Sequence, residues 1–461
     1  MQQRGPMKRT VWQWLVVSSF LLGLRSPAET RPQYGGTLHL ATRISPSSLD
    51  PADATQGDSL ARRNLIRLVF DTLVSLDAEG KAQPALAVSW RAESGNQRWQ
   101  LWLRNNVKFH DGSPMTPEAV AASLRTANPD WTVLAANDSV IIQTNANDPD
   151  LLAELAMARN SVAKKLSGGA WVGTGPFRIT NWQPQKSVTL SAVEDYWGGR
   201  AFPDTIDVQF GRNPRDQLID FDLGKLQIAD VALEQTHYIA GEGRHIVNSA
   251  PLELVALVFA REPQSTDDAK LREVIALSID RASIRSGVLQ DSGEPSAAIL
   301  PNWITGYAFV FPSGRELTKA QEERSEIQRA PALSVGYDPD DGLVRLIAER
   351  IVLNARDAGI TLQAIAGAKT DIRVVRVTLS STNPRIALQA SATALGLTAP
   401  KVSGTSIEDV YKAESELLRS KRVIPLFQLP LSYAVSPAVQ NWNIGPDGSW
   451  HLPDIWLGSA P

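Results

Sequence analysis

The sequence predicts an α/β protein with more than one lobe. Its 461 residues exceed the size at which a single hydrophobic core stops growing, so two or three subdomains are expected. In the C-terminal half, a strand-like run over 333–337, an amphipathic helix over 343–357 and a strand at 360–362 follow one another. Strand, helix and strand in that order are typical of a parallel sheet covered by helices.

The N-terminus has the pattern of an export signal. Basic residues precede an apolar run over 11–24, which is shorter than the about 20 apolar residues that a membrane-spanning helix needs. The small residues Ser26 and Ala28 follow at positions suited to cleavage. Residues 1–28 are therefore predicted to be a signal peptide, with an uncleaved anchor or a buried helix as the alternatives.

The chain contains no cysteine. A chain of this length does not need disulfides for stability, so their absence is compatible with export to an oxidising compartment. Bacterial lipoproteins are tethered through a lipid on a cysteine that follows the signal, and none is present. The mature protein is therefore expected to be soluble and periplasmic.

Four local patterns organise the N-terminal half. Alternating residues predict a strand at 37–42, and helical spacing of apolar residues predicts a helix over 60–76. A hairpin is expected around 94–96, between two tryptophan-containing strands. The sequence Thr116-Pro117 is typical of a helix start, since threonine caps and proline fits the first turn.

Two further features are expected in the C-terminal half. A strand at 372–379, a helix at 407–418 and an apolar strand at 423–427 predict a second strand-helix-strand unit. Pro425 is expected at an edge or a crossover, because proline donates no ladder hydrogen bond. Residues 316–329 are interpreted as a polar insertion.

The composition argues against several functions. The formal net charge of -3 offers no basic field for phosphates, so no nucleic-acid partner is expected. The motifs of serine hydrolases, zinc proteases and P-loop enzymes are absent, and a thiol nucleophile is excluded. Five scattered histidines predict neither a metal site nor acid-base catalysis. No cofactor and no catalytic residue is predicted, and the protein is not expected to be an enzyme.

Three short motifs are interpreted structurally. In Phe109-His110-Asp111-Gly112, glycine supplies a positive φ and aspartate an Asx-type hydrogen bond, which predicts a turn rather than a metal fragment. The stretch 173–176 lacks the third glycine of a dinucleotide fingerprint, so a tight turn before a strand at 177–182 is expected. Tyr196-Trp197 predicts an aromatic plug beside a turn.

Several segments, taken in order, resemble one known family. They are GGTLHLA, SLDP, FDTLVSLDAEGKAQPALAVSW, WQLWLRNNVKFHDGSPMTPEAVAASL, VGTGPFRITNWQP, LSAVEDYWGGRAFPDTIDVQF, LREVIALSIDRASIRSGVL and GEPSAAILP. In order and spacing they look like the extracellular solute-binding protein family 5, the peptide, nickel and opine-binding component of ABC importers. Val274 and Ser278 depart from the family's usual residues. The resemblance extends from Gly35 to about Pro301.

The resemblance implies a two-lobed periplasmic-binding-protein type II fold, with a small subdomain inserted in the first lobe. Lobe 1 is assigned to 34–60, 165–250 and 430–461, the inserted subdomain to 61–164, and lobe 2 to 251–429. Crossover segments between the lobes are expected at 252–260 and 423–429. Ligand-driven closure of the lobes is then a population shift.

The function implied by the resemblance is capture of a small solute, peptide-like or otherwise polar, and its delivery to the permease of an ABC importer. A monomer is expected. The alternatives are a non-transport sensor or scaffold with a degenerate cleft and, with less support, an exported hydrolase. Peptide binders of the family hold the peptide ammonium with an aspartate in lobe 2. The corresponding stretch here, 378–384, has no such aspartate, so peptide binding in that mode is not predicted.

Candidate ligand-binding residues come from loops expected between the lobes. They are Arg43, Ser45, Ser47, Asn302, Trp303, Arg376, Gln428 and Tyr433. Aromatic side chains with a few polar groups suit a small-molecule pocket. Two arginines in such a set would imply an anionic group on the solute. The alternative is that each residue has a structural or surface role.

Overall fold

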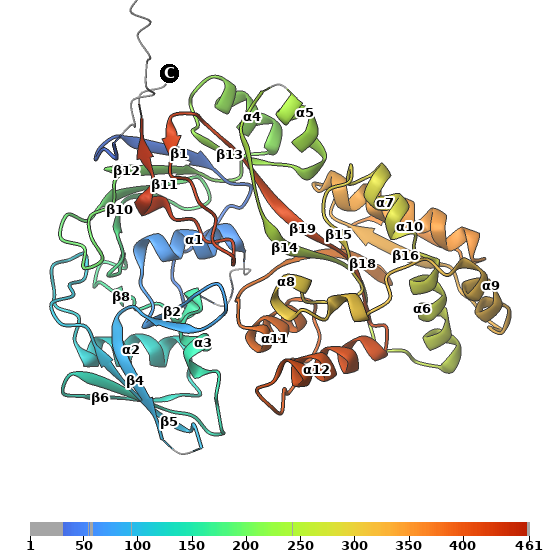
Figure 1. The fold of residues 1–461 in the computed structure, drawn as a ribbon, viewed down its shortest axis with the longest axis horizontal. Helices are drawn as coiled ribbons and strands as arrows, with labels where there is room; N and C mark the ends of the chain where they lie inside the picture. Colours follow the sequence, from blue (N-terminus) through green and yellow to red (C-terminus); the bar gives the residue numbers. More distant parts are fainter. Residues whose placement is uncertain (1–30, 54, 56–58, 94, 242, 459–461) are drawn as a thin grey trace, which may run out of the picture. The chain divides into compact units, whose positions relative to one another are not determined.

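A computed structural model of the chain describes residues 31–53, 55, 59–93, 95–241 and 243–458. Residues from Gln33 onward belong to one compact unit, built from two α/β lobes and a smaller inserted subdomain (Figure 1). The predicted fold class is confirmed. The predicted signal peptide, residues 1–28, lies outside the described residues. In the described part of the chain, no helix has the length and apolar character needed to cross a membrane.

One mixed sheet extends through both lobes. In spatial order its strands are β10 (Phe177–Gln183), β11 (Ser187–Ala192), β12 (Thr205–Gln209), β1 (Thr37–Ala41), β13 (Ile228–Val231), β19 (Val423–Val435), β14 (Ile246–Phe259), β18 (Ile372–Thr378), β16 (Leu333–Tyr337) and β17 (Leu362–Ala366), with β15 (Glu294–Pro295) paired to β19. β1 is parallel to β12 and β13, and β16 is parallel to β17 and β18. The strand-helix-strand unit predicted from 333–362 therefore exists.

The strands β14 and β19 are antiparallel and connect the lobes. Their pairing extends from Ile246 opposite Ala434, beside β13, to Val258 opposite Val423, beside β18. Figure 1 shows both strands passing between the two lobes. The segments expected to cross over, 252–260 and 423–429, lie almost entirely within these strands. The exact division of the chain into domains stays a prediction.

Helices cover this sheet and fill the inserted subdomain. They are α1 (Leu60–Val69), α2 (Pro117–Ala127), α3 (Leu151–Leu155), α4 (Pro214–Asp222), α5 (Thr236–Gly241), α6 (Thr266–Ser278), α7 (Arg281–Gly287), α8 (Asn302–Thr305), α9 (Leu317–Ser325), α10 (Gly342–Asp357), α11 (Pro384–Ala394) and α12 (Ile407–Arg419). The subdomain also has a sheet in the order β4 (Ala87–Ala92), β5 (Arg98–Leu103), β7 (Ser139–Gln143) and β6 (Thr132–Ala136). Short two-stranded sheets are formed by β2 (Val74–Leu76) with β3 (Ala82–Pro84), β8 (Lys164–Lys165) with β9 (Trp171–Val172), and β20 (Val439–Gln440) with β21 (Trp456–Leu457).

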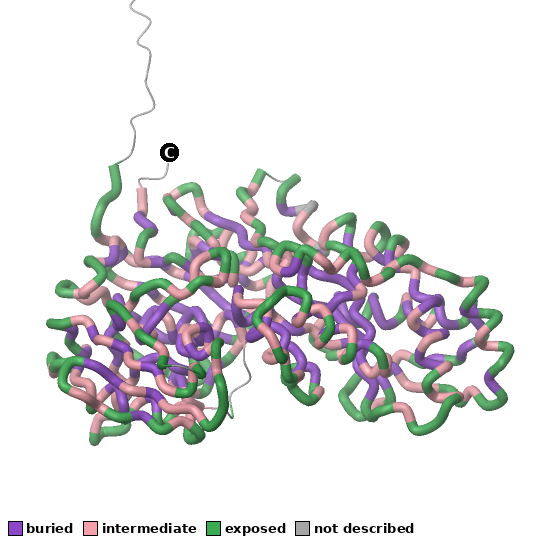
Figure 2. Tube along the Cα trace, turned by 60° about the horizontal axis from the view of Figure 1, so that its bottom comes forward, coloured by how far each residue is buried: buried purple, intermediate pink, exposed green. Residues whose placement is uncertain are grey.

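Separate hydrophobic cores support the two lobes and the subdomain. In β14 the side chains alternate between the two faces of the sheet, as strand geometry requires. Val255 and Leu257 pack with α6 and α10, whereas Leu254 and Ala256 belong to the core that includes α11 and α12. Lobe 1 and the inserted subdomain each have a further buried cluster. In Figure 2 the buried residues follow the strands through the middle of the molecule.

Most predicted local signals are confirmed. Thr116 caps α2 by accepting a hydrogen bond from the backbone N–H of Ala119, and Pro117 lies in the first turn. The turn at Gly112 has φ +82°, and the Asp111 carboxylate accepts the N–H of Ser113 at 3.0 Å. The strand at 37–42, the hairpin around 94–96, and the helices at 343–357 and 407–418 correspond to observed elements.

The bounds of two expected elements are wrong. The helix predicted over 60–76 ends at Val69, because the Val69 carbonyl accepts the N–H of Gly175 at 3.0 Å, and residues 74–76 form β2. The strand expected at 360–362 lies instead at Leu362–Ala366. For residues 316–329, interpreted as a polar insertion, no secondary structure was expected; the structure places α9 there, packed on α6 through its buried Ala320.

Pro425 lies within β19, in the middle of the crossover. The pairing of β19 with β14 shifts register there, since Val255 faces Phe427 while Ala256 faces Pro425. The shift leaves Leu426 without a partner on β14, so Pro425 lies directly beside a bulge, where the ladder is already interrupted. The Pro425 carbonyl accepts a hydrogen bond from the buried Arg281 at 2.7 Å.

Candidate functional site

Two cavities share Trp450 in their linings, and the first of them lies where the crossover strands meet both lobes. The first, here named the crossover cavity, has a volume of about 450 Å³. It is lined by the end of β1, the start of α1, β13, the β14–β18–β19 junction and the N-terminus of α10. Because these elements come from both lobes, a molecule in this cavity would contact both at once.

The lobe 1 side of the crossover cavity carries an ion pair. Arg43 follows β1, and its Nε lies 2.7 Å from Oδ2 of Asp230 in β13. Asp230 raises the pKa of Arg43 above its ordinary value, and the nearby Glu253 adds to this effect. The guanidinium is therefore held as a cation that already has an anionic partner.

The lobe 2 side carries a second, more buried group of charges. Arg376 in β18 binds Glu253 of β14 through Nε at 2.8 Å, and Asp341 through Nη1 at 2.8 Å. Burial alone would lower the pKa of Arg376, but the two carboxylates raise it above its ordinary value. Asp341 also caps α10, because its Oδ1 accepts the N–H groups of Leu343 and Val344. Arg376 is thus fixed between a crossover strand and a helix N-terminus.

Aromatic side chains form a further wall of the crossover cavity. Tyr433 of β19 is buried, and its hydroxyl accepts a hydrogen bond from Nε1 of Trp450 at 3.3 Å. Burial raises the pKa of Tyr433 above its ordinary value, so the phenol stays neutral. Its ring makes edge contacts with Trp442 and Trp450. These aromatic groups provide a rigid surface of the kind that solute pockets use.

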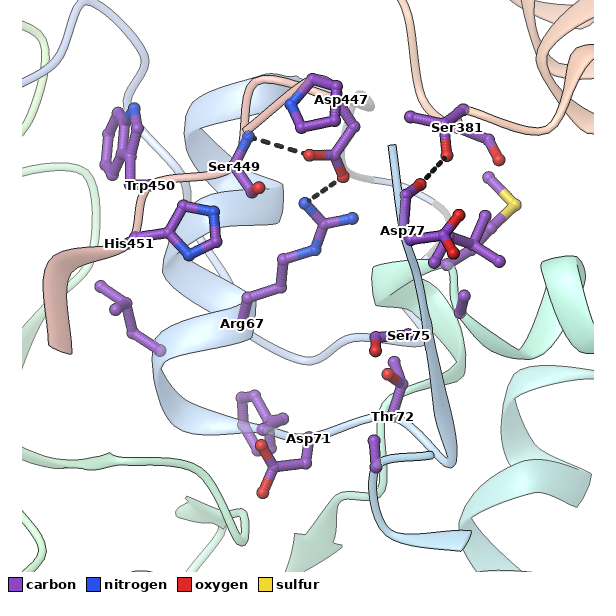
Figure 3. A pocket seen from close by; sticks show the side chains of 18 of the residues that line it. Arg67, Asp71, Thr72, Ser75, Asp77, Ser381, Asp447, Ser449, Trp450 and His451 are labelled. Carbon is purple, nitrogen blue, oxygen red and sulfur yellow. Dashed lines mark hydrogen bonds and ion pairs between the residues drawn. The ribbon is translucent and has the colours of Figure 1, made fainter. Parts of the chain in front are cut away.

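The second cavity, here named the α1 cavity, has a volume of about 580 Å³ and shares Trp450 with the first (Figure 3). Arg67 of α1 reaches the carboxylate of Asp447 at 2.7 Å, as Figure 3 shows. Burial would raise the pKa of Asp447, but Arg67 and hydrogen bonds from Ser449 lower it to about 2. Ser381 and its neighbours, Ser380 and Thr382, face this cavity from lobe 2.

Asp71 at the edge of the α1 cavity has three hydrogen-bond donors. They are the hydroxyls of Thr174 and Tyr196, at 2.9 and 3.0 Å, and Nε1 of Trp197 at 2.8 Å. Burial raises the pKa of Asp71 to about 6 in spite of these hydrogen bonds. The carboxylate joins the end of α1 to the turns at 173–176 and 196–199. The aromatic pair predicted as a plug therefore acts as a polar anchor as well.

Comparison with known proteins identifies the family. The model for bacterial extracellular solute-binding proteins, family 5 (middle region), matches residues 81–368. The chain belongs to this family. It is 24% identical over 370 residues to the probable D,D-dipeptide-binding periplasmic protein DdpA of Escherichia coli K12, covering 73% of this chain and 71% of that protein. It is 23% identical over 367 residues to the oligopeptide-binding protein OppA of Bacillus subtilis, covering 67% of each chain.

Solved structures share the fold of this family 5 protein. A dipeptide-binding protein from Pseudoalteromonas sp. SM9913, in complex with Met-Leu, has a TM-score of 0.78 at 16% identity, covering 92% of this chain and 100% of that one. NikA from Staphylococcus aureus, in complex with Ni(L-His)2, has a TM-score of 0.75 at 15% identity, with the same coverage. The chain is therefore a solute-binding protein of the kind that supplies ABC importers.

The eight candidate ligand-binding residues divide into three groups. Arg43, Arg376 and Tyr433 meet at the crossover cavity. Ser45 and Ser47 are exposed on the loop after β1 and do not line either cavity.

The other three candidates lie around the crossover strands, outside both cavity linings. Gln428 is buried, and its side-chain amide donates to the Ile299 carbonyl at 2.9 Å. Nε1 of Trp303 donates to the Pro251 carbonyl at 2.8 Å, while Asn302 is exposed at the start of α8. Gln428 and Trp303 therefore attach the segment around α8 to the two crossover strands.

Several cavity residues were missed by the sequence prediction. Asp230, Glu253 and Trp450 lie on segments that the sequence did not mark as loops between the lobes. Asp341 is the second residue of an Asp-Asp pair directly before α10, and aspartate at this position is typical of a helix N-cap. It is a helix cap, but its second carboxylate oxygen also binds Arg376.

His451 of the α1 cavity offers one possible nitrogen ligand. Among the residues that the structure describes, no three histidine, aspartate or glutamate side chains are grouped so as to hold a metal ion.

Proposed function

We propose that this family 5 protein captures a small solute that carries a positive charge in the crossover and α1 cavities, and delivers it to an ABC importer. The charge balance of the cavities carries this proposal. The crossover cavity has two arginines and five carboxylates, which are those of Asp230, Glu253, Asp338, Asp340 and Asp341. The α1 cavity has one arginine and the four carboxylates of Asp71, Asp77, Asp447 and Asp454.

The arginines of the two cavities are already paired with carboxylates, which disfavours the anionic solute that two arginines would imply. Arg43 is paired with Asp230, Arg376 with Glu253 and Asp341, and Arg67 with Asp447. An anion would have to displace a carboxylate, leaving that carboxylate buried without a partner, which is costly. A cationic group would instead add to the existing network, beside the exposed carboxylates of Asp338 and Asp340.

Short peptides fit this description. A dipeptide has an ammonium group, a carboxylate and a backbone amide, and a cavity of a few hundred Å³ suits a ligand of that size. Among its relatives, DdpA is named as a probable D,D-dipeptide-binding protein, and the Pseudoalteromonas protein is in complex with Met-Leu. In the stretch 378–384, Ser380, Ser381 and Thr382 offer hydroxyls rather than an aspartate, so the ammonium would be held from elsewhere in the cavities.

The remaining parts of this proposal concern the cellular context. Export through the predicted signal peptide, a soluble periplasmic form without a lipid anchor, a monomeric state and a permease partner are all proposed on the sequence and on family membership. Binding rather than catalysis is proposed because the family and its relatives are binding proteins. A sensor or scaffold role with a degenerate cleft remains the alternative, and loss of all solute binding would favour it.

Isothermal titration tests the charge preference directly. The protein is titrated with a dipeptide and with its N-acetylated form, which differs only in lacking the ammonium group. We expect the free dipeptide to bind more tightly, with a difference that shrinks at high salt, since exposed charges are screened. Equal affinities, or tighter binding of the acetylated form, would contradict the proposal.

A pair of variants connects this preference to the cavity. Replacing both Asp338 and Asp340 by asparagine removes exposed carboxylates without breaking an ion pair of Arg376. One charge at 4 Å in water is worth about 1 kcal/mol, so the dipeptide should bind about fivefold more weakly for each carboxylate that faces the ammonium. Asp195→Asn is the matched control, because Asp195 is an exposed carboxylate paired with Lys108, outside both cavities.

A further inference from the structure

The inserted subdomain and lobe 2 touch at a second place, away from the crossover strands. On the subdomain side the contact is made by α3 and the turn at 77–80, and on the lobe 2 side by the start of α11. Leu151 and Leu155 anchor α3 in the subdomain core, whereas Ala387 and Leu388 anchor α11 in lobe 2. Figure 1 shows α3 on the side of the subdomain that faces lobe 2. The contact thus joins two separately packed bodies.

A partly buried ion pair lies at the centre of this contact. Arg385, in the first turn of α11, donates from Nε to Oδ1 of Asp150 at 2.9 Å, and from Nη2 to the same oxygen. Its Nη1 donates to the Gly404 carbonyl at 2.7 Å, within lobe 2. The side chains of Arg385 and Asp150 are 10% and 14% exposed, so water screens their attraction little.

The position of Asp150 leaves its carboxylate available for this pair. Asp150 is the N-cap residue of α3, yet its side chain accepts no hydrogen bond from the helix backbone. N-cap aspartates usually satisfy those backbone groups. Here the carboxylate instead points across the boundary to Arg385, where it makes a charge-assisted contact between the two bodies.

Apolar and backbone contacts surround the ion pair. Ile386, the residue after Arg385, packs with Ala153 and Met157 in a small buried cluster. Beside it, the Thr382 hydroxyl donates to the Asp77 carbonyl at 3.1 Å.

The turn that carries Asp77 is shaped for this approach. Gly80 has φ +75°, and a Cβ placed there would lie 2.9 Å from the Thr382 carbonyl oxygen. A side chain at this position would therefore collide with lobe 2. The close approach of the two surfaces depends on glycine.

We propose that this contact, named here the α3–α11 latch, holds the inserted subdomain and lobe 2 together in the absence of solute. Its residues also line the α1 cavity, since Met157, Ala153 and Thr382 belong to both. Opening the cavity therefore requires breaking the latch. A latch of this kind raises the population of the closed form, so less of the solute's binding energy is spent on closure. This inference concerns the solute-free protein and does not depend on the identity of the solute.

The absence of cysteine makes the lobe separation measurable. Spin labels are attached to cysteines introduced at Thr126 in α2 and at Lys412 in α12, two exposed helical positions on either side of the latch. Distances are measured by double electron–electron resonance on the full chain, after unfolding and refolding to remove bound solute. We expect a narrow, short distance distribution for the parent protein. Arg385→Ala should shift the distribution to longer distances.

Further variants separate a latch from a general loss of structure. Asp150→Asn keeps the size of the side chain and should produce the same shift, while the exchanged pair Asp150→Arg with Arg385→Asp should reverse part of it. Arg419→Ala, which removes an exposed ion pair within α12, should change nothing. Circular dichroism checks that each variant is folded.

The inference is overturned if folded Arg385→Ala and Asp150→Asn variants keep the parent distance distribution. It is also overturned if the parent protein is already open without solute. Failure of the dipeptide titration would leave these distances unaffected, so the two proposals fail independently.

Discussion

Glu414 predicts a specific dependence of stability on pH. This glutamate of α12 is completely buried in lobe 2. Its Oε1 accepts the N–H groups of Ile299 and Leu300, and its Oε2 accepts the hydroxyl of Tyr307 at 2.6 Å. Burial raises the pKa of Glu414 from 4.5 to about 7, although these hydrogen bonds act in the opposite direction. We expect Glu414→Gln, which preserves the shape and one acceptor, to remove this titration.

The sign and the size of the effect follow from linkage. Between pH 4.5 and 7 the folded protein holds a proton on Glu414 that the unfolded chain has released, so this group's contribution to stability falls as pH rises. A tenfold change in an ionisation constant corresponds to about 1.4 kcal/mol. The free energy of unfolding of Glu414→Gln, relative to the parent, should therefore rise by about 3 kcal/mol between pH 4 and pH 8.

Urea unfolding at a series of pH values measures this difference. Taking the difference between variant and parent removes the contributions of other titrating groups, including Asp71, whose pKa is also raised. Glu322→Gln, at an exposed position on α9, is the matched control and should give a difference that does not change with pH. If the difference for Glu414→Gln is equally flat, the carboxyl is not held in the buried hydrogen-bonded position described here.

Two further predictions concern packing and charge around the cavities. Gly173→Ala places a Cβ 2.1 Å from the Val69 carbonyl oxygen, so we expect the free energy of unfolding to fall by more than about 3 kcal/mol and the melting temperature to fall with it. Gly168→Ala is the control, because the space around Gly168 is open and the substitution should cost little. Equal melting temperatures for the two variants would contradict this prediction. Arg376→Met leaves the buried Glu253 without its hydrogen-bonding partner, so the free energy of unfolding, measured with denaturant, should fall by about 3–5 kcal/mol. Adding Glu253→Gln to this variant should recover most of the loss. If the second substitution instead causes a further, additive loss, the role of the pair is refuted.

The fold was largely predictable because its signals are local. Alternation in β1, helical spacing in α10 and α12, and capping at Thr116 each depend on neighbouring residues. The helix predicted over 60–76 failed for a non-local reason, since Gly175, far along the chain, takes the Val69 carbonyl. Asn383-Pro384 is a local helix-start signal of the same kind, and α11 begins there with Asn383 as its cap.

The candidate site was less predictable. Arg43, Arg376 and Tyr433 do meet at a cavity, but the sequence did not indicate that carboxylates would pair with both arginines. Arg43 and Asp230 are 187 residues apart, and Arg376 and Glu253 are 123 apart. These pairs form only because β14 and β18 lie side by side and β13 ends near β1. The charge of a cleft between two lobes is a property of the assembled sheet, and single loops do not reveal it.

Native mass spectrometry of the freshly purified protein tests the central claim most directly. The protein is ionised intact, any bound small molecule is released in the instrument, and its mass and charge are determined. The account predicts a small solute that carries a positively charged group, with reduced occupancy in the Asp338→Asn, Asp340→Asn double variant and unchanged occupancy in Asp195→Asn. A bound anion without a cationic group, or a protein that binds neither a co-purified solute nor added dipeptides, would contradict it.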